Sequence, residues 1–126
     1  MSSAAIPPSD FRHVLQELVV SVPGAWGAIF VDFEGEAVDL YATSDAYEVK
    51  LAGAHAGLLW GRIVAAGNEA KLGKSRGVAV LAQGQRFYVH ALDAEYFVLL
   101  ATAAKGPVGL ARARLALAVT ALRKLL

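Results

Sequence analysis

The sequence contains no cysteine and has few charged residues, and both features narrow the range of functions. Without cysteine, the chain can form no disulfide, no thiolate nucleophile and no cysteine-ligated zinc site. Charged residues make up 18% of the 126 residues, whereas hydrophobic residues make up 56%. Such an apolar composition is typical of a domain whose elements are buried on both faces, or of a protein with an obligate interface.

The sequence also lacks a recognisable targeting segment. Its first eight residues, MSSAAIPP, have neither a basic start nor an apolar core of signal-peptide length. A chain of 126 residues has the length of one domain. We therefore expect a disordered lead over residues 1–8, a single domain over residues 9–126, and a cytoplasmic protein.

Charge is balanced overall but uneven along the chain. Residues 1–63 hold three basic and eight acidic residues, a net charge of −5, whereas residues 64–126 hold nine basic and three acidic residues, a net charge of +6. Attraction between the two halves on folding is the simpler explanation, and a basic patch for an acidic partner is the alternative. With a total of only +1, nucleic acid is not an expected partner.

Hydrophobic periodicity predicts three helices and five strands, in the order α, β, β, α, β, β, β, α. We expect the helices over residues 10–22, 45–66 and 107–126, and the strands over residues 25–32, 37–43, 77–82, 86–92 and 96–103. Gly67 and Asn68 should end the second helix. Because a strand as apolar as residues 96–103 cannot have one face in water, helices should cover both faces of a five-stranded antiparallel sheet. The expected fold class is a three-layer α/β sandwich.

Three glycines, Gly53, Gly57 and Gly61, lie four residues apart in the second predicted helix and so follow one face of it. Each glycine in a helix interior costs about 1 kcal/mol relative to alanine, so such a row favours close approach by another element. Lys50, His55 and Arg62 interrupt the apolar run, which is too short to span a membrane. We expect a second copy or a relative to pack on this row in water. The alternative is that the glycines let the helix lie flat on its own sheet.

No catalytic, cofactor or metal site is expected. Histidines 13, 55 and 90 fall on three different predicted elements without metal-ligand spacing, and no serine lies in a nucleophile pattern. The acidic cluster around the hairpin at residues 32–39 is more typical of turn chemistry than of paired catalysis. Trp26 is expected in the core, and Trp60 fits either the core or a partner contact. The sequence therefore predicts a protein that is not an enzyme.

Two segments resemble the Roadblock (dynein light chain) domain family. Residues 22–35, VPGAWGAIFVDFEG, are similar to the family's opening, in which a helix leads into a strand and a DxxG hairpin turn. Residues 109–115, GLARARL, are similar to the start of its C-terminal helix. The motif residues in these segments are Gly24, Asp32, Gly35 and Gly109. The order of elements agrees with the family over residues 10–126.

The resemblance implies a module that dimerises through its long helix, residues 45–66, and the neighbouring edge strand, residues 75–82. The implied dimer interface includes Gly53, Gly57, Gly61, Lys50, Ala54, His55, Trp60, Val78 and Val80. Family members carry no active site and act as platforms for small Ras-like GTPases. Among bacterial members the sequence is similar to the MglB and MglC proteins, which set cell polarity with the GTPase MglA. Because no long extension follows the last predicted helix, we expect an adaptor, either a homodimer or a heterodimer with another Roadblock protein.

Two further expectations concern ligands. Arg112 and Arg114 lie in the first turns of the last predicted helix, where positive charge opposes the helix dipole. They suggest an acidic partner, either Glu17 of the first helix or another protein. The alternative function is a small-molecule sensor with its ligand between helix and sheet, for which only His90, Tyr88 and Tyr41 offer polar groups within the strands.

Overall fold

The computed structural model describes residues 10–126, so the expected lead over residues 1–8 lies outside the described part of the chain. The elements are α1 (Asp10–Ser21), β1 (Ala25–Asp32), β2 (Ala37–Ala42), α2 (Ala46–Glu69), β3 (Gly77–Leu81), β4 (Gln85–Ala91), β5 (Tyr96–Ala103) and α3 (Val108–Leu125). Their order is the one predicted from the sequence, and both the fold class and the order are confirmed.

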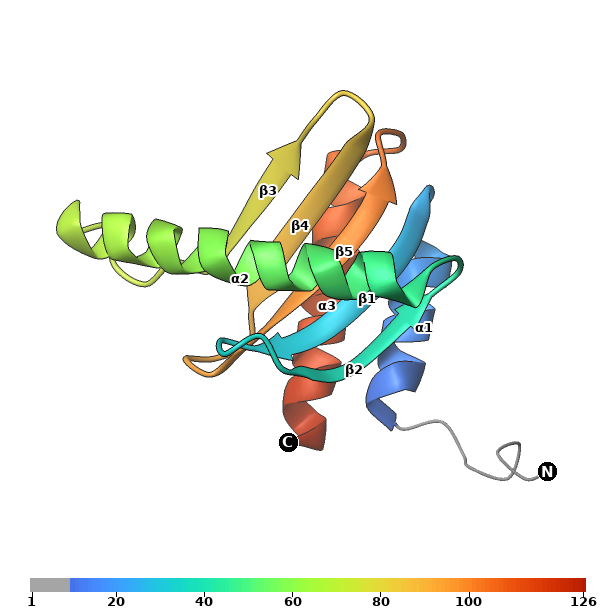
Figure 1. Ribbon diagram of the computed structural model, residues 1–126, viewed down its shortest axis with the longest axis horizontal. Helices are drawn as coiled ribbons and strands as arrows, with labels where there is room; N and C mark the ends of the chain where they lie inside the picture. The colour runs from blue at the N-terminus through green and yellow to red at the C-terminus, as the bar shows by residue number, and fades with distance from the viewer. Residues whose placement is uncertain (1–9) are drawn as a thin grey trace.

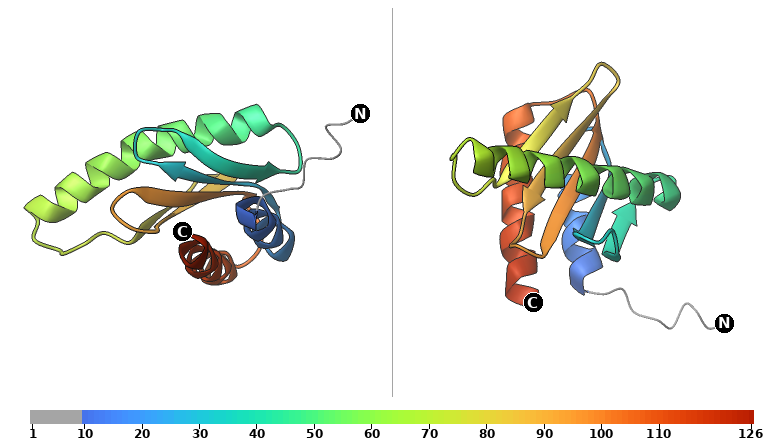
Figure 2. Two further views of the ribbon diagram at one scale, coloured as in Figure 1. Left: turned by 90° about the horizontal axis from the view of Figure 1, so that it is seen from below. Right: turned by 60° about the vertical axis from the view of Figure 1, so that its left-hand side comes forward.

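The five strands form one antiparallel sheet in the order β2-β1-β5-β4-β3 (Figure 1). Helix α2 crosses one face of this sheet, and helices α1 and α3 lie together on the other (Figure 2). Strands β2 and β3 are the two edges of the sheet. The predicted three layers are therefore present, with helices on both faces.

Strands β1 and β5 are buried on both faces because their side chains alternate between two cores. In β1, Ala28 and Phe30 join the core beneath α1 and α3, whereas Ile29 and Val31 join the core beneath α2. Strand β5 divides in the same way, with Val98 and Leu100 on the α1–α3 face. Since side chains point to opposite faces in turn, a continuous apolar run serves both cores.

Helix α2 starts where the sequence predicts and ends later. Asp45 caps its start, and its Oδ1 accepts a hydrogen bond from the Tyr47 amide at 2.9 Å. The prediction that Gly67 and Asn68 end the helix is wrong, because the helix continues through both to Glu69.

The end of α2 is a Schellman-type cap in which a lysine occupies the position that usually holds glycine. The Leu72 amide donates to the Gly67 carbonyl at 2.9 Å, and the Lys71 amide donates to the Asn68 carbonyl at 3.2 Å. Lys71 has a φ of 58°, in the left-handed region. Gly67 instead lies in the helix close to the next segment, where an added Cβ would lie 2.9 Å from the Ser75 hydroxyl.

The motif residues around β1 form the turns that the resemblance implies. Gly24, with a φ of 81°, links α1 to β1, and Gly35, with a φ of 92°, lies in the β1–β2 turn. Asp32 accepts hydrogen bonds from the amides of Glu34 and Glu36 at 2.9 Å each. Gly109 lies in the first turn of α3 and is exposed. The acidic residues of this hairpin thus include a turn-forming aspartate, as its spacing suggested.

Candidate functional site

The three glycines of α2 do not share one environment. Gly53 is buried, and an added Cβ would lie 3.1 Å from Cγ2 of Ile29 in β1. At Gly57 the nearest atom would be Cζ of Phe97, at 3.6 Å. Gly61 is exposed, with nothing within 4 Å of the added atom. Four residues advance by about 40° beyond one full turn, so the row winds from the sheet towards the surface.

Two residues expected at the dimer interface face the subunit's own interior. Trp60 is 1% exposed and belongs to the core beneath α2, together with Ile29 and Phe97. Gly53 is pressed against the same core. For Gly53 the alternative interpretation describes the structure, because this glycine lets α2 lie close to its own sheet. Gly53 and Trp60 therefore belong to the subunit's own core and not to its surface, which corrects the expectation that they lie at an interface.

The outward side of α2 carries exposed leucines in addition to the residues expected at its surface. Lys50, Ala54 and His55 are exposed, as a surface role requires. Beside them, Leu58 is 72% exposed, and Leu51 and Leu59 are 40% and 41% exposed. For Leu51 and Leu58 the available signal was that both lie off the row of residues that packs on the sheet. Leu59 was expected to face the core, and its exposure is a correction.

Strand β3 adds an open edge to this side of the molecule. It pairs with β4 alone among the described strands, so its other edge has no strand partner within residues 10–126. Val78 is half-buried against the core beneath α2, and Val80 is 36% exposed. An unpaired edge strand next to exposed leucines is a surface on which another chain can pack.

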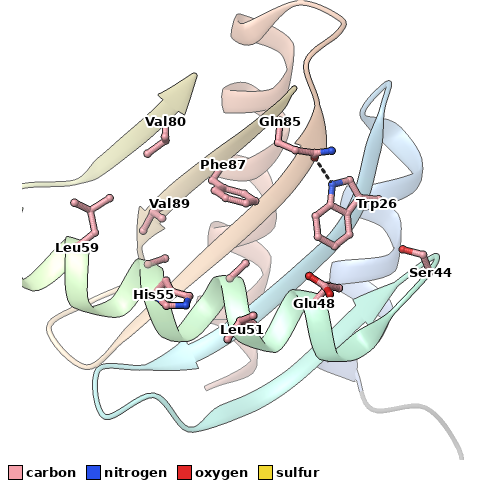
Figure 3. Close-up of a pocket in the computed structure, with 12 residues that line it drawn as sticks. Trp26, Ser44, Glu48, Leu51, His55, Leu59, Val80, Gln85, Phe87 and Val89 are labelled. Carbon is pink, nitrogen blue, oxygen red and sulfur yellow. Dashed lines mark hydrogen bonds between the residues drawn. The ribbon is translucent and has the colours of Figure 1, made fainter. Parts of the chain in front are cut away.

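A cleft with a volume of about 740 Å³ lies between α2 and strands β3 and β4. Leu59 and Val80 lie at one end of it and Trp26 at the other, with His55 along its helix side (Figure 3). Trp26 is half-buried, and its Nε1 donates to Oε1 of Gln85 at 2.8 Å. Leu51, His55, Leu59 and Val80 line this cleft, and Leu58 is exposed next to Leu59 on α2 without lining it. We call these five residues together the α2–β3 surface.

The polar strand residues expected to serve a ligand between helix and sheet lie elsewhere. Tyr88 and Tyr41 contact the core beneath α1 and α3, on the far face of the sheet from this cleft. Tyr88 is 1% exposed, and its hydroxyl has no hydrogen-bond partner among residues 10–126. His90 lines a different cavity. None of the three lines the cleft beside α2, whose polar lining includes Ser44, Glu48 and Gln85 instead.

Arg112 and Arg114 are exposed on α3, and neither side chain makes an ion pair or hydrogen bond within residues 10–126. Glu17, one of the two acidic partners considered for them, lies instead 3.1 Å from Nε2 of His13 on its own helix. The two arginines therefore remain available to another molecule.

The described residues hold no cluster of three or more histidine, aspartate or glutamate side chains that could bind a metal ion. His13, His55 and His90 lie on α1, α2 and β4, the elements expected for them. Within residues 10–126, no helix has the length and apolar character needed to cross a membrane.

Comparisons with known proteins agree on the architecture. No family model and no curated protein sequence matches the chain. Solved structures match it over nearly their whole length. A Roadblock/LC7 domain from Streptomyces avermitilis has a TM-score of 0.85 at 19% identity, covering 93% of this chain and 98% of that one. A structure described as MglB with tetrameric arrangement has a TM-score of 0.82 at 13% identity, covering 95% and 93%.

MglC from Myxococcus xanthus is similar with a TM-score of 0.66 at 24% identity, covering 94% of this chain and 100% of that one. Identities this low bear on the fold rather than on a shared partner or activity. Helix order, sheet order and coverage all agree with these structures, and the chain therefore has the Roadblock/LC7 fold.

Proposed function

We propose that this protein is a non-catalytic, dimeric adaptor that scaffolds or modulates a small Ras-like GTPase of the MglA type. In this proposal the second subunit is either another copy of the chain or a second Roadblock protein. The observation that carries the proposal is the α2–β3 surface, where exposed leucines adjoin an unpaired strand edge on a Roadblock/LC7 fold.

Within residues 10–126, one subunit leaves leucine side chains of α2 in water and one edge of β3 without a strand partner. Leu58 alone leaves 72% of its surface in water, and Leu51 lies on the same side of α2, two turns earlier. Burying a leucine side chain contributes about 1.5–3 kcal/mol. The open edge of β3 offers backbone groups that a matching strand can pair with. A partner that covers both would continue the sheet and the helix layer across the contact.

The similarity to MglB and MglC structures supports the choice of a GTPase regulator. One of those structures is described as tetrameric, which is consistent with a fold that associates with further copies. Arg112 and Arg114, which make no ion pair in the described chain, are our candidates for contact with an acidic partner.

The first experiment measures self-association. Leu58→Glu puts a charge on the most exposed leucine of the α2–β3 surface, so we expect a dimer dissociation constant at least about a hundredfold higher by sedimentation velocity. Val20→Glu is the matched control, because Val20 is 73% exposed on α1, on the other face of the sheet. If the wild-type chain stays monomeric both alone and mixed with Roadblock proteins of the same organism, the dimer is excluded.

The second experiment tests the GTPase. A purified MglA-type GTPase from the same organism, loaded with GDP or with a GTP analogue, is titrated with the wild-type protein and with Leu58→Glu. We expect nucleotide-dependent binding that is weakened in the variant, with GTP hydrolysis recorded in parallel. Absence of binding in both nucleotide states would count against the GTPase as partner while leaving the dimer intact.

One observation supports the alternative function of a small-molecule sensor: the cleft of about 740 Å³ between α2 and the sheet. Trp26, Phe87 and Leu51 give it an apolar lining typical of small-molecule sites. The two functions compete for the same surface, since a second subunit on Leu51 and Leu59 would cover the cleft. A ligand that dissociates the dimer when it binds would favour the sensor.

A further inference from the structure

A second cavity lies on the opposite flank of α2 from the α2–β3 surface. Its volume is about 1010 Å³, and its lining comes from five parts of the chain. Four of these parts are the C-terminal half of α2, the segment between α2 and β3, the end of β4 with the turn that follows it, and Arg123 of α3. Phe33 of the β1–β2 turn adds a fifth. We call it the basic cavity.

Positive charge dominates this lining. Lys74, Arg76 and Arg123 face a single carboxylate, that of Asp93. That carboxylate is already engaged, because its Oδ1 accepts hydrogen bonds from the amides of Glu95 at 2.7 Å and Tyr96 at 3.0 Å. It therefore serves the β4–β5 turn and is not paired with the cations around the cavity.

The cations have no acidic partner in the described chain. The ion pairs within residues 10–126 join Arg12 to Asp39 and His13 to Glu17, both at the other end of the sequence. Arg123 is held in place instead, because its Nη2 donates to the Leu92 carbonyl at 2.6 Å. Its remaining guanidinium donors, with the ammonium of Lys74 and the guanidinium of Arg76, can serve an anion.

The rest of the lining is largely apolar, and Gly61 adds no side chain to it. Phe33, Val64 and Leu92 contribute hydrophobic wall. Gly61 lies at the same wall, and an added Cβ would meet no atom of the subunit within 4 Å. A mid-helix glycine costs about 1 kcal/mol and here has no packing role within the subunit. A ligand in the cavity would give Gly61 a role, because the missing side chain leaves room for it.

We propose that the basic cavity binds a small organic anion, with a phosphate or carboxylate at Lys74, Arg76 and Arg123 and a ring-sized apolar body against Val64 and Gly61. Charge-assisted hydrogen bonds fix the head group, and burial of the apolar body adds the rest of the affinity. The site does not rest on the proposed function, because no residue of the α2–β3 surface lines the cavity. Gly61, Ser75 and Arg76 do lie within the dimer elements that the family resemblance implies, so ligand binding and self-association are measured separately.

The test is a titration of the isotope-labelled wild-type protein, followed by backbone amide NMR shifts. Two whole probes are used: phenyl phosphate carries a phosphate head group, and benzoate carries a carboxylate. Two half-probes serve as controls: inorganic phosphate supplies the head group alone, and benzyl alcohol supplies the apolar ring alone. We expect saturable shifts at Gly61, Ser75, Arg76 and Ala94. Both half-probes should bind at least about tenfold more weakly than the better whole probe. Tighter binding of phenyl phosphate identifies a phosphate ligand, and tighter binding of benzoate identifies a carboxylate.

Variants separate the cavity from general surface charge. The double variant Lys74→Gln/Arg76→Gln should weaken the better probe by about tenfold or more. The matched control, Arg112→Gln/Arg114→Gln, removes the same charge from α3 and should leave the affinity unchanged. Gly61→Ala should weaken the probe as its methyl enters the cavity, while the fold stays intact by its amide spectrum.

Three results would each overturn the proposal: no saturable shifts, equal affinity for the whole probe and a half-probe, or equal loss in the α3 control. Sedimentation of the same samples reports the dimer separately. If Leu58→Glu is monomeric and still binds phenyl phosphate, ligand binding in the basic cavity does not require the dimer.

Discussion

Alanine substitution of two glycines in α2 tests how this helix sits on its sheet. Gly53 and Gly61 have the same helix-propensity deficit, so alanine at either should gain about 0.5–1 kcal/mol of unfolding free energy from the backbone alone. At Gly61 that gain should be realised in full, because the added methyl meets no atom within 4 Å.

At Gly53 the added methyl would lie 3.1 Å from Ile29 Cγ2 and 3.4 Å from both Ile29 Cδ1 and Val31 Cγ2. Overpacking of a close-packed core costs about 1–3 kcal/mol. At Gly53 the cost of overpacking should therefore outweigh or cancel the gain in helix propensity from alanine. We therefore expect Gly53→Ala to be less stable than Gly61→Ala by about 1–3 kcal/mol, with wild type between them or equal to Gly53→Ala.

Urea unfolding followed by circular dichroism measures this difference. All three proteins are compared at one protein concentration, because association would shift apparent stability by mass action. An equal gain at both positions would refute the reasoning, since it would mean that Gly53 is not pressed against Ile29 and Val31.

The remaining predictions concern the rest of α2 and the start of α3. Gly57→Leu should lower the unfolding free energy by about 1–3 kcal/mol, because its Cβ would already lie 3.6 Å from Phe97 Cζ in the subunit's own core. Unchanged urea stability would disprove this, and any loss of dimer in the variant must be read together with its stability. Lys71→Gly should raise stability by about 0.5–1 kcal/mol, because Lys71 holds a φ of 58° that glycine adopts without strain. A lower melting temperature would be the opposite result. Reversal of Arg112 and Arg114 to glutamate should weaken binding of an acidic partner through charge repulsion, while thermal stability stays within about 0.5 kcal/mol of wild type, because both side chains are exposed and lie beyond the first turn of α3. Partner titration and thermal unfolding report the two quantities, and unchanged binding would show the idea to be wrong.

Where strands lie could be predicted well because their signal is local. Residues 25–32 and 96–103 are apolar runs closed by turn residues, and β1 and β5 have these bounds. The end of α2 could not be predicted in the same way. Gly67 is a usual terminator, but here it allows close approach to Ser75, and the chain leaves the helix at Lys71 instead.

The candidate surface was predicted in part. The sequence pointed to α2, the helix on which the α2–β3 surface lies, and it identified Lys50, Ala54 and His55 as surface residues. It did not identify Leu58, and it placed Trp60 at the interface although Trp60 is buried in the core. Helical periodicity gives the relative directions of side chains, but it does not say which direction faces the sheet when apolar residues surround the helix.

The sequence by itself determined the number, kind and order of the elements and the burial of the central strands, because local periodicity and turn residues specify these. Tertiary structure alone decided the orientation of α2 about its axis. That orientation sets Gly53 against Ile29, leaves Leu58 in water and opens Gly61 beside Lys74, Arg76 and Arg123. It results from close packing between residues far apart in the sequence. Shape complementarity at these contacts, rather than residue type alone, selects the face that is buried.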